Sequence, residues 1–87
     1  MHEASLMANL MRRIEDAARA EGARRVTGVA VRLGALSHLS PEHFAEHFEE
    51  ASRGSVAEGA RLEIAVSDDI EDAQAQEILL ESVEVEI

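Results

Sequence analysis

The stretch RVTGVAVRLG at residues 25–34 decides the fold, because it alternates β-favouring and small side chains and then stops at a glycine. This alternation predicts a β-strand over Arg25–Leu33 that ends before Gly34. The residues expected on one face of the strand are Thr27, Val29, Val31 and Leu33. Those expected on the opposite face are Val26, Gly28, Ala30 and Arg32.

A helix is expected before this strand, over residues 4–22. Its apolar side chains recur every three or four residues, which is the spacing of an amphipathic helix, and Gly22 is a natural end. We expect Met7 and Met11 to fill core space, because both lie on the apolar stripe. The residues of that stripe are Leu6, Met7, Leu10, Met11, Ile14, Ala17 and Ala18.

A second helix is expected after the strand, from Pro41 to about Ser52. Ser40 is a preferred N-cap residue, and proline is favoured at the first helical position that follows it. Phe44 and Phe48 lie four residues apart, so they should anchor one face of this helix in the core.

Two further strands are expected, Arg61–Val66 and residues 78–87, joined as a short acidic hairpin by the polar residues 67–76. The strand–helix–strand unit should make a right-handed parallel crossover, and the last strand should pair antiparallel. This predicts an α/β (α+β) two-layer sandwich of two helices against a three-stranded mixed sheet, in the order α-β-α-β-β. In the last strand, Leu79, Val83, Val85 and Ile87 should share one face, with Ser82, Glu84 and Glu86 on the other.

Composition limits the function. The 87 residues suffice for one domain, and the chain has no cysteine, which leaves no thiolate for zinc or for redox chemistry. The formal charge of −10 and the lack of Trp and Tyr argue against nucleic-acid binding. The lack of any long apolar run or signal segment leads us to expect a cytoplasmic protein that does not enter membranes. No nucleophile–base pair or phosphate-binding loop is recognisable, so we do not expect an enzyme.

The charge is unevenly distributed along the chain. Residues 1–33 contain six arginines and four acidic residues, whereas residues 62–87 contain nine acidic residues and no basic one. The favoured interpretation of the acidic end is a solvated face that keeps a small protein in solution. The alternatives are a docking surface for a basic partner or a weak collector of cations.

Met1, His2 and Glu3 form a candidate metal site at the start of the chain. The α-amine of Met1, the backbone amide nitrogen of His2 and its Nδ1 can close two fused rings around one cation, and the Glu3 amide is adjacent. Nitrogen ligands in a plane suit Ni(II) or Cu(II), whereas zinc prefers a tetrahedron. The competing interpretation is that His2 is an ordinary terminal residue.

Three other histidines are further candidate metal ligands. His43 and His47 are spaced i, i+4 on the second expected helix, so both imidazoles share one face and could bind a metal. The favoured interpretation is that they are boundary residues beside the phenylalanines, because the sequence places no third ligand nearby. His38 lies in an expected loop and is a secondary candidate ligand beside the amino-terminal set.

Four segments together resemble the HypA/HybF family of nickel-insertion accessory factors. They are MHEASL at residues 1–6, ARRVTGV at 23–29, LGALSH at 33–38 and RGSVAEG at 53–59. The resemblance covers residues 1–66 almost continuously and returns at 78–87. It implies Ni(II) at Met1, His2 and Glu3, docking to a nickel-handling maturation GTPase of the HypB type, and delivery to the large subunit of [NiFe]-hydrogenase.

One departure from the family pattern affects the expected role. Family members carry two Cys-x-x-Cys pairs around a structural zinc, in a second domain inserted between the last two strands. Here residues 67–76 take that place without a cysteine, so we expect one nickel domain over residues 1–87 and no zinc. The chain is then a natural minimal member or a shortened form, and a metal-independent adaptor of the same fold is the alternative function. A homodimer formed through a strand edge or by exchange of a terminal element is a further expectation.

Overall fold

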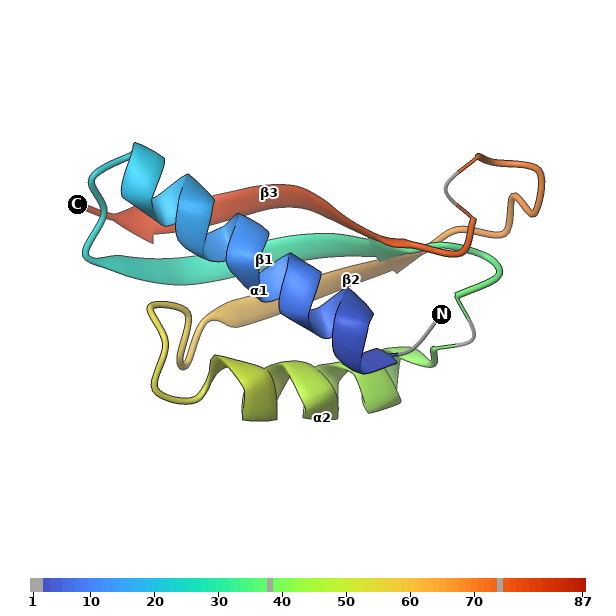
Figure 1. The fold of residues 1–87 in the computed structure, drawn as a ribbon, viewed down its shortest axis with the longest axis horizontal. Helices are drawn as coiled ribbons and strands as arrows, with labels where there is room; N and C mark the ends of the chain where they lie inside the picture. The colour runs from blue at the N-terminus through green and yellow to red at the C-terminus, as the bar shows by residue number, and fades with distance from the viewer. Residues whose placement is uncertain (1–2, 38, 74) are drawn as a thin grey trace.

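The computed structural model describes residues 3–37, 39–73 and 75–87. Its helices and strands follow the predicted order, which confirms the two-layer α+β fold (Figure 1). They are α1 (Glu3–Ala20), β1 (Arg25–Leu33), α2 (Pro41–Ser52), β2 (Arg61–Val66) and β3 (Ile78–Glu86). In Figure 1, α1 crosses in front of the sheet and α2 runs beside β2.

The strands lie in the order β2-β1-β3, so the predicted parallel crossover and antiparallel last strand are both confirmed. The predicted hairpin is wrong, because β3 pairs with β1 and is not a neighbour of β2. The physical reason is that the most buried strand takes the middle position, where both of its edges are hydrogen-bonded. Five of the nine residues of β1 are buried, whereas β2 has none that is fully buried.

Two β-bulges alter the predicted faces of the strands. The β1–β3 register skips Thr27 on β1 and Glu81 on β3, so each of these residues is an extra residue opposite its partner strand. The first bulge turns Val26, which is 1% exposed, into the core, and it leaves the Thr27 hydroxyl to donate to the carbonyl oxygen of Glu84. The predicted faces of these two residues were therefore wrong: Val26 lies on the core face with Val29, Val31 and Leu33, and Thr27 lies on the other face.

The second bulge has the same effect on β3. Ile78 and Leu80 join Val83 in packing against the core, although the regular alternation predicted Leu79 for that face. Ile87 lies after the end of the strand and is 73% exposed, so the prediction that it shares a face of this strand with Val83 and Val85 is wrong.

One hydrophobic core joins both helices to β1. The rings of Phe44 and Phe48 are buried, with centroids 6.2 Å apart, as predicted for the anchors of α2. Met7 is buried and Met11 packs against the core, which confirms their role as filler. The other core side chains are Leu10, Ile14, Ala18, Val26, Val29, Val31, Leu33, Ala57 and Ile78.

The predicted signals at the start of α2 are also confirmed. The Ser40 hydroxyl accepts a hydrogen bond from the backbone N–H of His43 at 3.1 Å, and Pro41 is the first helical residue. Gly54 follows the helix with a φ of 80°, in the left-handed region that glycine occupies without steric cost.

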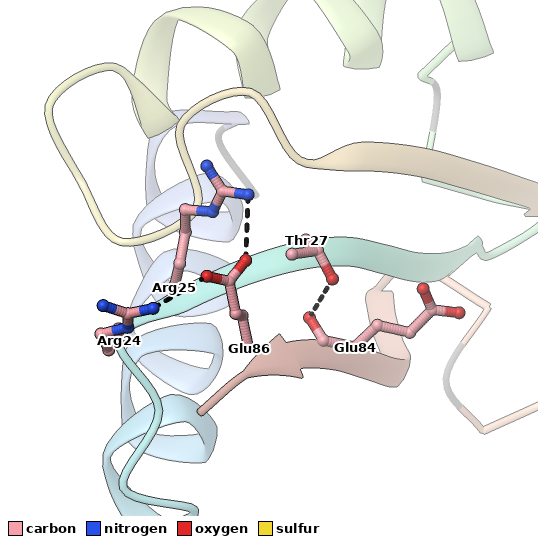
Figure 2. Close-up of polar contacts among 5 residues, drawn as sticks. All are labelled: Arg24, Arg25, Thr27, Glu84 and Glu86. Atoms are coloured by element: carbon pink, nitrogen blue, oxygen red, sulfur yellow. Dashed lines mark hydrogen bonds and ion pairs between the residues drawn. The ribbon is translucent and has the colours of Figure 1, made fainter.

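Ion pairs cover the face of the sheet opposite the core. The guanidinium groups of Arg24 and Arg25 each lie 3.2 Å from the Glu86 carboxylate, beside the Thr27–Glu84 hydrogen bond (Figure 2). Further along, Arg32 pairs with Glu81 and Arg61 with Glu84. Arginines of the basic first third therefore neutralise part of the acidic last third, and this supports the interpretation of a solvated charged face.

Candidate metal centre

The predicted amino-terminal ligands lie at the edge of the described structure. Met1, His2 and the secondary candidate His38 are outside the described residues, and Glu3 is the first residue of α1. The predicted ligand set therefore stays a prediction, and the described residues show its surroundings.

The first turns of α1 connect the candidate site to the core. Ala4 and Ser5 are exposed, Leu6 is half-buried, and Met7 is buried. The start of the helix is thus held by apolar packing from its second turn onward. Its first backbone N–H groups have no acceptor within the helix, because an acceptor would have to lie four residues earlier.

A groove of about 450 Å³ lies beside this helix start. Leu6 and Asn9 of α1 form one wall, and Ile70, Asp72 and Glu77 of the connection between β2 and β3 contribute to the other. The surroundings of the candidate site therefore combine apolar side chains with carboxylates that favour a cation. The sequence contained the acidic residues, but only the fold brings them to the start of α1.

The connection between β2 and β3 is held against the loop that follows β1. The backbone N–H of Gly34 donates to the Glu77 carbonyl at 2.9 Å, and that of Leu36 donates to the Ala75 carbonyl at 2.7 Å. Ser67 donates to the Leu33 carbonyl at 2.9 Å as the chain leaves β2. These bonds extend the sheet and hold one wall of the groove in place.

Within residues 3–37, 39–73 and 75–87, no group of three or more His, Cys, Asp or Glu side chains is arranged to hold a metal ion. A smaller arrangement is present on α2, where the rings of His43 and His47 have centroids 4.5 Å apart. The sequence prediction that both imidazoles share one helix face is confirmed by this contact.

Among the described residues, no helix is long and apolar enough to cross a membrane.

The sequence matches one protein family over most of its length. Residues 1–74 match the family described as "Hydrogenase/urease nickel incorporation, metallochaperone, hypA". The match begins at the first residue, so it includes the Met1-His2-Glu3 segment.

Three similar proteins carry the name hydrogenase maturation factor HypA. That of Methylocella silvestris is 42% identical over 66 residues, which are 76% of this chain and 58% of the relative. That of Albidiferax ferrireducens is 47% identical over 64 residues, which are 74% of this chain and 57% of the relative. That of Escherichia coli is 42% identical over 64 residues, which are 74% of this chain and 55% of the relative. The matched part of the chain thus spans less than two thirds of the length of these relatives.

Two solved structures have the same fold. The solution structure of the Ni metallochaperone HypA from Helicobacter pylori has a TM-score of 0.82 at 23% identity, covering 99% of this chain and 98% of that one. A second structure, described as the solution structure of HypA protein, has a TM-score of 0.73 at 23% identity, covering 98% and 96%. At this identity the likeness concerns the fold alone.

Proposed function

This chain belongs to the HypA family, and from that membership we propose that it is a nickel metallochaperone, which carries Ni(II) to an enzyme under assembly and catalyses no reaction itself. The observation that carries the proposal is the family match over residues 1–74, which includes Met1, His2 and Glu3. The family description names hydrogenase and urease, and the relatives are named for hydrogenase maturation. We therefore propose a [NiFe]-hydrogenase as the recipient.

The proposed nickel ligands are the α-amine of Met1 and the backbone amide and imidazole nitrogens of His2. The Glu3 amide or carboxylate is the proposed fourth ligand. These nitrogens lie close together in the chain and favour the planar geometry that Ni(II) accepts. His38 is the secondary candidate, and the absence of cysteine leads us to propose no thiolate zinc site.

The start of α1 favours Ni(II) binding in one respect and disfavours it in another. The amide of Glu3 can lose its proton without breaking a helical hydrogen bond, because the first N–H groups of a helix have no intrahelical acceptor. The positive end of the helix dipole disfavours a cation at the same place. Deprotonated amides and the carboxylates of Asp72 and Glu77 at the neighbouring groove would offset this repulsion.

Calorimetric titration of the untagged chain with Ni(II) tests the ligand set. We expect one tightly bound ion, and its loss when His2 is replaced by Ala or when residues are added before Met1. His38→Ala tests the secondary candidate. We expect this protein to keep tight binding, and a loss of tight binding would add His38 to the ligand set. Undiminished tight binding in both the His2→Ala and the extended proteins would contradict the assignment.

The same site should release nickel on acidification. An α-amine titrates near ~8 and an imidazole near ~6.5, and both must be deprotonated to bind a metal. Affinity should therefore fall between about pH 8 and about pH 5.5, across those reference values. A flat profile over this range would indicate a carboxylate site instead.

We propose two protein partners, a nickel-handling maturation GTPase and the large subunit of the hydrogenase. We also propose that residues 1–87 act as one nickel domain in the cytoplasm, with residues 67–76 in the place of an inserted zinc domain. Titration of the chain with each purified partner, in the presence and absence of Ni(II), tests this part of the proposal.

A metal-independent adaptor is the second candidate function. It is favoured by one observation, that the chain matches only 55–58% of the length of its relatives. The His2→Ala protein distinguishes the two candidates. An adaptor would bind the GTPase or the large subunit as well as the parent does, whereas a chaperone would lose the nickel-dependent part of the interaction.

We also propose that the chain self-associates through an edge of its sheet. β2 and β3 each pair with β1 on one side only, so each is an edge strand of the described sheet. Light scattering at rising concentration should show a dimer, and a strictly monomeric protein would contradict this part of the proposal. A Leu62→Lys or Ile64→Lys change is a poor probe, because both side chains pack against the core.

A further inference from the structure

The imidazoles of His43 and His47 form a pair on α2, distant in sequence from the proposed amino-terminal nickel ligands. Their ring centroids are 4.5 Å apart and the ring planes are tilted by 38°. His43 is exposed and His47 is half-buried, so the pair is open to solvent on one side. Residues four apart on a helix project in the same direction, and α2 therefore holds both rings without any loop.

The closeness of the two rings allows one metal ion to bind both. An imidazole nitrogen binds a metal at about 2.1 Å, which places the ring centroid roughly 3.2 Å from the ion. Two imidazoles on one ion therefore have centroids at most roughly 6.4 Å apart, and the observed 4.5 Å lies within that limit.

The charge of the surrounding helix also favours a cation. α2 contains four glutamates, Glu42, Glu46, Glu49 and Glu50, and no lysine or arginine. The segment His43-Phe44-Ala45-Glu46-His47 has the His-x-x-Glu-His spacing with which one class of metalloproteases binds zinc. Within residues 3–37, 39–73 and 75–87 the pair belongs to no group of three or more ligating side chains, so the arrangement supports binding rather than hydrolysis.

We propose that His43 and His47 form a second metal site, a two-imidazole chelate for a divalent transition-metal ion such as Ni(II) or Cu(II). α1 and α2 contact one another and start at the same end of the molecule (Figure 1). The second site therefore lies on the side of the protein from which α1 begins. It would collect nickel there with lower affinity than the amino-terminal set, because it supplies fewer protein ligands.

Nickel titration in a protein without the amino-terminal chelate tests this proposal. The starting protein has two residues added before Met1 and carries His2→Ala, so neither a free Met1 amine nor an imidazole at position 2 is available. We expect one Ni(II) ion per chain, bound roughly tenfold or more weakly after His43→Ala or His47→Ala, since a chelate becomes a single imidazole. Because Ni(II) with water ligands is paramagnetic, amide NMR signals around residues 43–47 should broaden selectively.

A spacing control separates chelation from a general attraction to histidine. Ala45→His combined with His47→Ala keeps the number of histidines but places them two residues apart, on different sides of α2. We expect this protein to bind nickel as weakly as the His47→Ala protein does. Thermal unfolding without metal checks that each variant is folded.

Two results would overturn the proposal. One is nickel affinity in the starting protein that is unchanged when both His43 and His47 are replaced, which would place the ion at the carboxylates. The other is equal affinity in the spacing control and its parent. Neither result bears on the amino-terminal site, which is tested separately by His2→Ala in the chain with a free Met1.

Discussion

The two faces of the sheet share the same three strands but are covered by different kinds of interaction. Toward the helices, Val26, Val29, Val31 and Leu33 of β1 are each no more than 3% exposed. Toward solvent, arginine–glutamate pairs lie over the small residues Gly28 and Ala30. Apolar burial is worth far more than exposed ion pairing, so the covered face should carry the stability and the open face should tolerate change.

The largest loss of stability is expected from Phe44→Ala, on the covered face. This ring is fully buried in the core, and its removal leaves a cavity that the surrounding side chains fill only in part. We expect a loss of about 3–5 kcal/mol in the free energy of unfolding, measured by urea denaturation. Glu46→Ala, an exposed change on the same helix, is the control and should cost far less. A loss below about 1 kcal/mol for Phe44→Ala would contradict the expectation that the covered face carries the stability.

The bulge in β1 makes a sharper comparison possible, between Val26→Thr and Thr27→Val. Val26 lies in the core, so a hydroxyl there has no water to bond and should cost about 1–3 kcal/mol of unfolding free energy. Thr27→Val removes one exposed hydrogen bond of 3.3 Å and should cost less than about 1 kcal/mol. A regular β1 without the bulge would place Thr27 in the core and would predict the opposite ranking. Denaturation of the two proteins therefore decides between a bulged and a regular strand.

A smaller effect is expected from the ion pair between Arg32 and Glu81, whose Nε and Oε2 atoms are 2.9 Å apart. The two side chains are 43% and 40% exposed, so solvent screens their attraction. A double-mutant cycle with Arg32→Ala and Glu81→Ala should give a coupling of about 0.2–1 kcal/mol. The coupling should shrink in about 1 M salt, where the screening length is only about 3 Å. A large coupling that salt does not change would mean that the open face also bears stability.

The smallest effect is expected from Gly28→Ala. An added Cβ would lie 2.9 Å from Oε1 of Glu84 and 3.0 Å from Nη2 of Arg61, both at the ends of flexible side chains that can move aside. We expect an unfolding free energy within about 0.5 kcal/mol of the parent, because the side chains that must move, Arg61 and Glu84, are 57% and 61% exposed. Gly28→Val is the contrasting variant, because its larger side chain displaces both partners.

The contribution of the Arg61–Glu84 ion pair to the stability of the open face should not depend on pH near neutrality. Hydrogen bonding and attraction from Glu84 raise the pKa of Arg61 above its ordinary value. A raised pKa means that the stabilising charge is fully present below the ordinary value and is lost only as pH rises through the raised one. The difference between the Gly28→Ala and parent proteins should therefore stay constant from about pH 6 to about pH 9.

The local pattern of residues predicted the elements well. β1 and β2 have the predicted bounds, and α2 begins at Pro41 after the Ser40 cap. These features depend on side-chain alternation and on capping chemistry, and both act within a few residues. The resemblance to the HypA family rested on residue identities and was confirmed by the family match.

The predictions that failed depend on contacts between distant segments. An extra residue such as Thr27 or Glu81 leaves no mark in a single strand, because a bulge exists only relative to the partner strand. The hairpin was expected because β2 and β3 are neighbours in sequence, whereas the burial of β1 makes it the middle strand. For the candidate metal sites, the i, i+4 spacing predicted the His43–His47 contact, but its 4.5 Å separation depends on the side-chain rotamers.

The central position of β1 has a consequence for how the protein is made. Arg25 pairs with Glu86, 61 residues later, so one edge of β1 stays without its partner until β3 has been synthesised. At about 5–20 residues per second, this interval lasts roughly 3–12 seconds. During that time Val29, Val31 and Leu33 belong to a nascent segment that cannot yet complete its sheet. The strand that organises the fold is therefore open to misassociation on the ribosome. Arg24 before the strand and Arg25 and Arg32 within it supply charges that oppose this misassociation.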